Sequence, residues 1–568
     1  MAMWLGRLAG AILLCAGVWQ GHAQPNAPDA IAQAIGQLGD SDHAVRYRAA
    51  MALGRAKDER AVDPLIAALG DSDDGVRAEA AKALGAQRDA RAVEPLVALL
   101  SDKKEKEWVR ENAAVSLGDL RDPRAIPALI PLLGYRSIGY QNNASEALVK
   151  IGEPAVEPLI AMLGSSRATL RKRAINTLME LKDPRAVEPT IAALRDSNEE
   201  VRYWAADALG QFHDLRAADP LAAVAAEPGH IERGPALGSL VELHDPRAVE
   251  LAIAALDDPD ARVGGWAAGA LKKAHDARAI PALIALLERG DGSAKGSYAR
   301  WQAVEALASL HGTAKPPVPL ADALIAALIV VLDDPDAGVR SSAAVALGDF
   351  GGSRAVEPLI ALLGDGDENV VNAARASLGK LRDRRAVEPL IAQLNRQDTT
   401  SYGAAAALGE IGDPRAVEPL VAAVRTAKDD FRRDAAARAL GELGRAAVGP
   451  LLELMKDPDL NLRRSAALAL ARIDDARVKR VLSKALQQRD LVVVSGADMF
   501  FLKRKDDPAV AAVLLEALRE RGDLRLANDL FHSRDTHLEQ AAIAWGSKRG
   551  YMVLGNGAGE RWLGPLMD

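Results

Sequence analysis

Three histidines at a constant spacing are the first residues of this chain that could do chemistry, because regularly placed imidazoles can bind a metal ion. His213, His244 and His275 are 31 residues apart, and each is followed by aspartate. Packed helices lie about 8–10 Å apart, whereas a zinc–nitrogen bond is only about 2.0–2.1 Å long, so one ion cannot easily join neighbouring helices. Elsewhere the same position holds other basic residues, namely Lys57, Arg88, Arg121, Lys182 and Arg382. A cation at the negative end of a helix dipole therefore explains the histidines better than a metal site.

Other sequence patterns typical of catalysis are missing. The chain contains no H-E-x-x-H, no G-x-S-x-G and no G-x-x-x-x-G-K-[ST]. The pairs Asp71/Asp73 and Asp334/Asp336 lack the glycine and the terminal glutamate of a calcium-binding loop, and they are explained as helix caps. The glycine-rich Gly555–Gly559 lacks the strand and helix that flank a nucleotide-binding loop. We therefore expect no catalytic residue, no metal and no cofactor.

A sequence motif that recurs along the chain indicates which elements must position any functional side chain. It reads Asp-Pro-Arg-Ala-Val-Glu-Pro-Leu-Ile at Asp183–Ile191. Variants of it begin at Asp58, Asp89, Asp122, Asp214, Asp245, Asp276, Asp383 and Asp413. The repeat is about 31 residues long, which is typical of a solenoid in which each repeat packs only on its neighbours.

Each repeat has the signals of two antiparallel helices. In Asp58–Gly85, Asp58 can cap a first helix that ends at Gly70, and Asp71 can begin the cap of a second helix that Gly85 closes. Apolar residues follow the helical period within both segments. A second proline, Pro64 in this repeat, should kink the first helix or restart it.

The pattern D-P-R-A-V-E-P-L-I-x-x-L-x-D-x-D-x-x-V-R-x-x-A-A-x-A-L-G resembles the PBS (phycobilisome) lyase HEAT-like repeat, here in an exported bacterial protein. About 15 copies extend from Ile31 to roughly Leu491. The resemblance implies an all-α, right-handed α/α superhelical solenoid. It also implies a ladder of ion pairs between inter-helix aspartates and the Val-Arg arginines, which are Arg46, Arg77, Arg110, Arg202, Arg340, Arg432 and Arg463. Val371 and Tyr402 replace that arginine, so the ladder should be interrupted in their repeats.

The two ends of the chain differ from the repeats. Arg7, the apolar run Leu8–Val18 and the small residues around Ala23 are typical of a secretory signal peptide cleaved after Ala23. Eleven apolar residues are too few for the roughly 20 that cross a bilayer, so we expect no membrane span. We therefore predict a signal peptide at residues 1–23, a solenoid at 24–490, and a C-terminal helical cap with a glycine-rich tail at 491–568. Within the cap, Asp507-Pro508 should open a helix that continues to about Arg521.

Composition narrows the range of functions further. The single cysteine, Cys15, lies within the predicted signal peptide, so the mature protein would contain no thiol and no disulfide. The net charge of −7 makes sequence-independent nucleic-acid binding a poor fit. A cleaved signal predicts a periplasmic or secreted protein, and we expect it to be a monomer.

One face of the second helices departs from the small and charged residues that most repeats place there. This face lies on the side away from the core and should form the concave wall of the solenoid. In the middle of the chain it carries Lys172, Arg173, Tyr203, Trp204, Trp266 and Trp301. Tryptophan, tyrosine and arginine dominate binding hot spots, which makes these residues candidates for partner binding. Alternatively, the aromatics fill space in the core that Gly264, Gly265 and Gly269 leave.

These observations favour a non-catalytic scaffold that presents its concave surface to a protein or peptide. The alternative is a repeat-fold enzyme related to bilin lyases or to deoxyhypusine hydroxylase. The latter family binds iron through His-Glu dipeptides, and no histidine in this chain is followed by glutamate.

Overall fold

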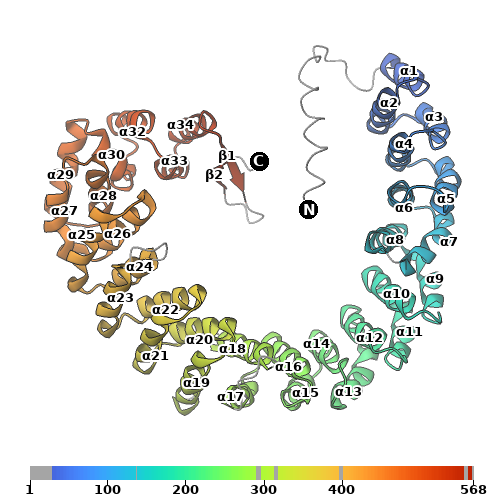
Figure 1. Cartoon of the computed structure of the whole chain (residues 1–568), viewed down its shortest axis with the longest axis horizontal. Coiled ribbons are helices and arrows are strands. Elements are labelled where there is room, and N and C mark those ends of the chain that lie inside the picture. The colour runs from blue at the N-terminus through green and yellow to red at the C-terminus, as the bar shows by residue number, and fades with distance from the viewer. Residues whose placement is uncertain are drawn as a thin grey trace. The chain divides into compact units, whose positions relative to one another are not determined.

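A computed structural model describes residues 28–135, 137–288, 296–311, 318–395, 401–555 and 561–565. The predicted signal peptide, Cys15 and most of the glycine-rich tail lie outside these described residues. Antiparallel helix pairs follow one another along the chain (Figure 1). The expected all-α solenoid is confirmed. The chain divides into two units, Met1–Ala267 and Ala268–Asp568.

The N-terminal unit contains eight pairs, in which a first helix is followed by a longer second helix. The first helices are α1 (Pro28–Gln37), α3 (Val62–Ala68), α5 (Val93–Ser101), α7 (Ile126–Leu129), α9 (Val156–Met162), α11 (Val187–Ala193), α13 (Ala218–Ala226) and α15 (Ala248–Ala255). The second helices are α2 (His43–Ala56), α4 (Asp74–Gln87), α6 (Glu107–Leu120), α8 (Ile138–Ile151), α10 (Ala168–Leu181), α12 (Glu199–Gln211), α14 (Arg233–Glu242) and α16 (Ala261–Ala274), the last of which continues past Ala267.

The C-terminal unit continues the alternation and ends in a different arrangement. Its first helices are α17 (Ile280–Glu288), α19 (Val318–Val330), α21 (Val356–Ala361), α23 (Val387–Leu394), α25 (Val417–Thr426), α27 (Val448–Leu454) and α29 (Ala476–Gln487). Its second helices are α18 (Ser297–His311), α20 (Ala337–Phe350), α22 (Glu368–Leu381), α24 (Ser401–Ile411), α26 (Asp430–Glu442), α28 (Leu460–Leu470) and α30 (Leu491–Gly496). The end comprises α31 (Asp498–Leu502), α32 (Pro508–Arg521), α33 (Leu524–Phe531), α34 (Thr536–Ser547) and an antiparallel hairpin of β1 (Tyr551–Gly555) and β2 (Arg561–Pro565).

Capping aspartates begin the first helices, as predicted. The carboxylate of Asp58 accepts a hydrogen bond from the backbone N–H of Arg60 and starts a short 3₁₀ turn over Glu59–Ala61. The α-helix then begins afresh at Val62, so Pro64 is its third residue. An N–H at that position has no partner within the helix, and proline therefore costs little there. The prediction that this proline marks a restart is confirmed.

The three evenly spaced histidines lie at the C-terminal ends of second helices, where a cation is favoured by the helix dipole. His213, His244 and His275 have left-handed backbones, and so do Lys57, Arg88, Arg121, Lys182 and Arg382, with φ between 50° and 56°. Within the part of the chain that the structure describes, no cluster of three or more His, Cys, Asp or Glu side chains could hold a metal ion.

Arginines join successive second helices. In α2, Arg46 donates to both carboxylate oxygens of Asp71 in the next repeat, at 2.7 and 2.8 Å, and to the carbonyl of Asp40. Ion pairs between repeats also join Arg77–Glu105, Arg171–Asp196, Arg202–Glu232, Arg233–Asp258, Arg300–Asp334, Arg340–Asp365 and Arg463–Asp490. The pairs of Arg77, Arg171, Arg300 and Arg340 are bidentate like that of Arg46, whereas Arg202, Arg233 and Arg463 each donate to one carboxylate oxygen. The predicted ladder is therefore present, although glutamate replaces aspartate in two of its pairs.

Two of the arginines assigned to the ladder behave differently. Arg110 donates to the carbonyl of Leu100 at 2.7 Å, and its guanidinium lies 5.3 Å from the ring centre of Tyr140. The prediction for Arg432 is wrong by one residue. Arg432 pairs with Asp429 of its own turn at 3.3 Å, whereas Arg433 donates to the carbonyl six residues earlier, the contact that marks the ladder position.

The interruption predicted at Val371 is confirmed, and a different arginine takes over the contact between layers. Val371 is buried, and Arg375, one turn further along α22, reaches the side chain of Gln393 at 2.9 Å. Gln393 in turn donates to the carbonyl of Leu363 at 2.8 Å. Tyr402 does not occupy the ladder position: it is 40% exposed and packs against Phe431.

Replacing a ladder arginine should destabilise the protein far more than replacing an exposed one. Arg340→Ala would leave the largely buried carboxylate of Asp365 without its bidentate donor, and we expect a loss of about 2–3 kcal/mol in unfolding free energy. As a matched control, Arg385→Ala removes exposed ion pairs to Asp383 and Glu357, and should cost about 0–1 kcal/mol. Urea unfolding followed by circular dichroism measures both losses, and equal losses would contradict this role of the ladder.

The capping carboxylates should make the solenoid sensitive to acid. The Arg60 side chain, with help from its backbone N–H, lowers the pKa of Asp58 from 3.8 to about 2, and Arg477 does the same for Asp475. A carboxyl with a lower pKa in the folded chain stabilises folding above pH 4, and that stabilisation is lost as the pH falls towards 2. We expect helicity at 222 nm to be constant from pH 7 to about 4 and to fall between about pH 4 and 2. A transition centred above pH 5 would contradict this assignment.

Candidate functional site

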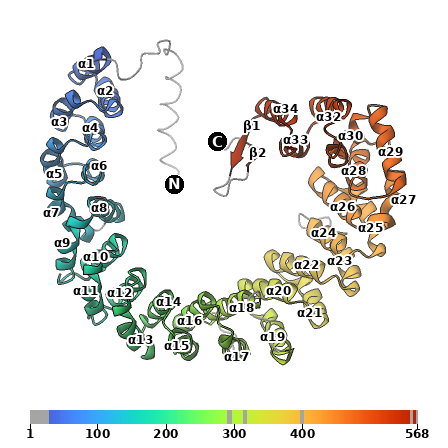
Figure 2. The ribbon, with the colours of Figure 1, turned by 180° about the vertical axis from the view of Figure 1, so that it is seen from behind.

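The second helices line one side of each unit. In the N-terminal unit they lie on the inner side of the curve that the helix pairs follow, and the first helices lie on its outer side (Figure 1). Viewed from behind, the C-terminal unit shows the same order, with α20 and α22 inside α19 and α21 (Figure 2). The face of each second helix that points away from the core therefore lies on this inner side. A partner bound there would contact the residues of that face.

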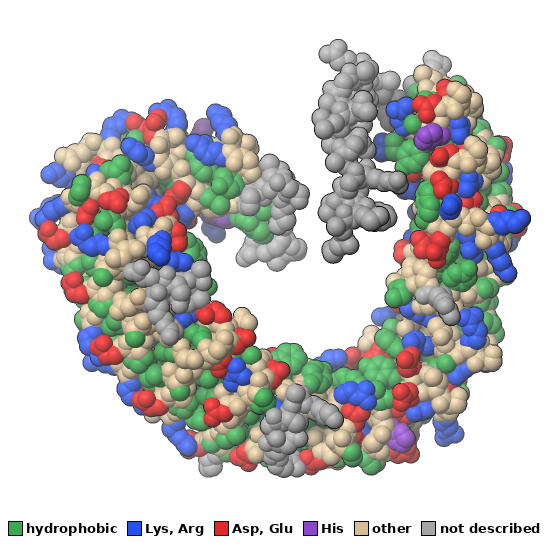
Figure 3. All heavy atoms as spheres, in the orientation of Figure 1, with side chains coloured by type: hydrophobic (Ala, Val, Ile, Leu, Met, Phe, Trp, Pro, Cys, Tyr) green, Lys and Arg blue, Asp and Glu red, His purple; other side chains and the backbone are tan. Residues whose placement is uncertain are grey.

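Tyr203, Trp204 and Trp266 form one aromatic cluster in the N-terminal unit. The ring centres of Tyr203 and Trp204 are 5.7 Å apart with an edge-to-face geometry, and those of Tyr203 and Trp266 are 5.6 Å apart. All three side chains are partly exposed. Hydrophobic side chains gather on the inner side of this unit over α12 (Figure 3).

A glycine in the intervening helix makes this cluster possible. Gly234, in the first turn of α14, lies between the helix that carries Tyr203 and the helix that carries Trp266. A Cβ atom at Gly234 would lie only 2.1 Å from Cε3 of Trp266, so the indole occupies the space that a side chain would take. The Trp266 ring thus packs on the α14 backbone and reaches Tyr203 two repeats away. Gly234 followed by Pro235 is the sequence signal for this close contact, which was not predicted.

The two predicted cations lie on the neighbouring helix α10. Lys172 is partly exposed and pairs with Glu200 at the start of α12 at 2.6 Å. Arg173 contacts the side chain of Asn142 at 3.4 Å. Both side chains thus join repeats as well as facing outward.

Trp301 belongs to the C-terminal unit and forms a separate feature. Its indole N–H donates to the hydroxyl of Ser342 at 3.1 Å, and its ring centre is 6.1 Å from that of Tyr298. Trp301 is 36% exposed. A second pair in the same unit, Tyr402 and Phe431, has ring centres 5.2 Å apart and was not predicted as a site. Both unpredicted partners, Tyr298 and Phe431, are second residues of second helices, as Tyr402 is.

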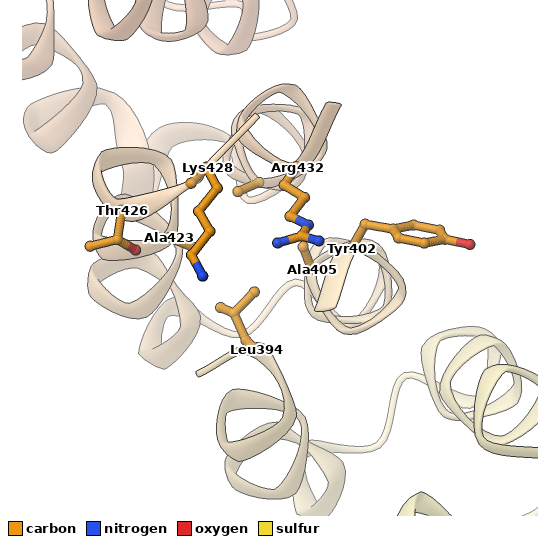
Figure 4. Close-up of a pocket in the computed structure, with 9 residues that line it drawn as sticks. Leu394, Tyr402, Ala405, Ala423, Thr426, Lys428 and Arg432 are labelled. Carbon is orange, nitrogen blue, oxygen red and sulfur yellow. The ribbon is translucent and has the colours of Figure 1, made fainter. Parts of the chain in front are cut away.

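A small pocket lies between α23, α24, α25 and α26. The amino group of Lys428 and the guanidinium of Arg432 point towards Leu394 inside it, while the Tyr402 ring points away (Figure 4). Its volume is about 30 Å³, which accommodates one or two water molecules and is far below the roughly 300 Å³ of a typical ligand site. This pocket does not provide a small-molecule site.

The comparisons with known proteins agree with this architecture. The family model described as HEAT repeats matches residues 31–107, 103–169, 156–241, 293–379, 324–401, 373–441 and 433–498, well over half of the chain. The PBS lyase HEAT-like repeat model matches residues 263–289. No curated protein is similar enough to this chain to count as a relative. None of the described helices is long and apolar enough to cross a membrane.

Among solved structures, the chain is similar to yeast importin-beta, Kap95p. In a structure of Kap95p with RanGDP, the identity is 13%, the match covers 91% of this chain and 80% of that chain, and the TM-score is 0.54. In the Kap95:Nup1 complex the identity and coverage are the same and the TM-score is 0.50. These likenesses show the fold. The CpcE–CpcF phycocyanin lyase complex of Nostoc sp. is 28% identical over 41% of this chain and 97% of that chain, with a TM-score of 0.24.

Adding a single methyl group should disrupt the aromatic cluster. In Gly234→Ala the new Cβ would collide with Trp266 and displace its indole, and we expect a loss of about 1–3 kcal/mol in unfolding free energy. In a chain that already carries Trp266→Ala, Gly234→Ala should cost much less than it does in the wild-type chain, because the collision is removed.

The control for this cycle lies in the same helix. A Cβ at Gly238 meets no atom within 4 Å, so Gly238→Ala should be neutral or stabilise by up to about 1 kcal/mol. Thermal melts of the four variants measure the coupling. Additive effects of Gly234→Ala and Trp266→Ala would show that the indole does not occupy this space.

Proposed function

The chain belongs to the HEAT repeat proteins, and we propose that it is a non-catalytic protein–protein interaction scaffold. In this proposal the second-helix face of the N-terminal unit holds a protein or peptide partner. The observation that carries the proposal is the cluster of Tyr203, Trp204 and Trp266, which is partly exposed on that face.

Large aromatic side chains are rare in this chain, and several of them lie on the second-helix face. The core elsewhere consists almost wholly of alanine, leucine, valine and isoleucine, and only 4% of the chain is aromatic. Most of the described layers pack without tryptophan, so core packing alone does not account for three large rings that stay partly exposed. Partly exposed, pre-packed aromatic rings lose little side-chain entropy on binding, and they dominate hot spots in interfaces. Lys172 and Arg173 on the adjacent α10 would add polar contacts at the rim.

The fold likeness supports a partner of this kind. Kap95p, which shares the solenoid architecture, is described in complexes with RanGDP and with Nup1. At 13% identity this concerns the fold, and the transfer of protein binding to this chain is part of the proposal.

A repeat-fold enzyme related to bilin lyases or deoxyhypusine hydroxylase is the second candidate. Its support is the match to the PBS lyase HEAT-like repeat at residues 263–289. The sequence offers no His-Glu dipeptide for iron. We therefore favour the scaffold. We propose that it acts outside the cytoplasm, on the basis of the apolar run Leu8–Val18 and the small residues around Ala23, and that it is a monomer.

Trp204→Ala is the sharpest test of the binding face. Because Trp266 packs on Gly234, its removal would also cost stability. Within the described cluster, the ring of Trp204 contacts the ring of Tyr203 alone. We expect Trp204→Ala to leave helicity unchanged and to reduce recovery of the principal co-purifying protein at least tenfold, which corresponds to a hot spot of about 1.4 kcal/mol or more.

The matched control is Trp108→Ala. Trp108 is 44% exposed at the start of α6 in the same unit, outside the cluster. Affinity purification from the native envelope with quantitative mass spectrometry compares the two variants with the wild type. Equal recovery by both variants, or a lowered melting temperature for Trp204→Ala alone, would contradict the proposed function.

A further inference from the structure

A second candidate surface lies in the C-terminal arrangement, far along the sequence from the aromatic cluster. Helices α32 and α34 enclose a groove of about 780 Å³. Its apolar part comprises Leu515 and Leu518 on α32 and Trp545 on α34. This volume is within the range of sites that accommodate a ligand, unlike the pocket of about 30 Å³ in Figure 4.

The charges around this groove are opposite in sign to those of the chain. Four cations line it, namely Arg489, Arg519, Lys548 and Arg549, against a single acid, Glu516. Glu516 is already paired with Arg489. The net charge of the lining is therefore +3, four cations less one acid, whereas the whole chain carries −7. Figure 3 shows several Lys and Arg side chains on the surface over α32 and α34.

The cations are exposed, and two of them have few competing contacts. Arg519 pairs with the exposed Glu520 at 2.9 Å, whereas the Lys548 side chain forms no ion pair with the part of the chain that the structure describes. Arg549 lies 4.5 Å from the ring centre of Trp545, which holds the guanidinium at the groove through a cation–π contact. Trp545 itself is fixed, because it is buried and stacks on Tyr551 with an angle of 7° between the rings. The groove thus presents oriented positive charge beside a rigid apolar surface.

We propose that this groove binds an acidic peptide segment that carries a large apolar side chain. The acidic residues would face Lys548, Arg519 and Arg549, and the apolar side chain would lie against Leu515, Ala512 and Ala544, which line the groove and are at least partly exposed. Charge complementarity selects the anion, and the apolar floor selects a peptide over a nucleic acid, whose phosphates would leave that floor uncovered. A lipid surface fits less well, because the apolar residues are recessed in a groove and do not protrude.

This proposal uses none of the residues on which the scaffold function depends. A peptide could bind at α32 and α34 whether or not the Tyr203–Trp204–Trp266 cluster holds a partner. In a solenoid, substitutions many repeats apart act independently, so the two sites can be tested separately.

The test uses the full-length protein and a fluorescein-labelled peptide of twelve residues, ten Glu or Asp with two central Phe. We expect saturable binding by fluorescence anisotropy that weakens as salt rises from 50 to 500 mM. Lys548→Glu combined with Arg519→Glu should weaken binding at least tenfold. A peptide with Ser in place of Phe should also bind at least tenfold more weakly to the wild-type protein.

Two controls make the outcome decisive. Arg480→Glu with Lys484→Glu reverses two exposed cations on α29, outside the groove, and should leave binding within twofold of wild type. Trp204→Ala should also leave it unchanged. Equal binding by the groove variant and the wild type would overturn the proposal. So would equal loss in both charge-reversed variants, or tighter binding of single-stranded DNA or of phosphatidylserine vesicles than of the peptide.

Discussion

The bidentate pairing of an arginine in one repeat with a carboxylate in the next is the interaction on which the rest of the structure depends. Most ladder arginines are also anchored by a carbonyl of their own repeat. Arg340, for example, donates to the carbonyl of Asp334 and reaches forward to both carboxylate oxygens of Asp365. Because both partners are largely buried, the pair loses little to solvent screening and fixes the distance between layers. A core made mainly of small aliphatic side chains could slide, whereas this planar, directional contact sets one register.

The departures from the ladder show how the chain keeps its layers joined when the arginine is lost. At Val371 the contact moves one turn along the helix, to Arg375 and Gln393. At α16 the corresponding residue is Gly264, and Lys272 of the same helix pairs with Glu305 of the next repeat at 3.2 Å. On the other side of α16, aromatic packing adds to the ladder pair Arg233–Asp258, because Trp266 lies on the backbone of Gly234 and touches Tyr203. The same rings therefore serve cohesion and leave part of their surface exposed. Packing and binding, which the sequence left as alternatives, are compatible for Trp266.

Local features of the sequence predicted the fold well because their causes lie within one repeat. Capping aspartates, helix-ending cations and the predicted helix from Asp507 to about Arg521, which is α32, all depend on neighbours a few residues away. The error at Arg432 arose because Phe431 precedes the two arginines, so no valine fixes the register. The contact between Gly234 and Trp266 spans two layers. The groove beside Trp545 belongs to helices that have no sister copy, and neither feature has a pattern within a single repeat.

A repeated scaffold separates stability from recognition in a way that a single globular core does not. Each layer contributes its own small core, and many layers add a ladder pair, so a substitution on the exposed face of one second helix changes little in its neighbours. Trp204 and Lys548 can therefore differ from the repeat without weakening the packing that Val, Ala and Leu provide. In a globular domain all surface residues rest on one shared core, so substitutions at two sites can be coupled energetically through that core. In this chain each surface residue has to be compatible only with the layer on which it packs. Distinct surfaces of one chain can therefore bind partners of different chemistry.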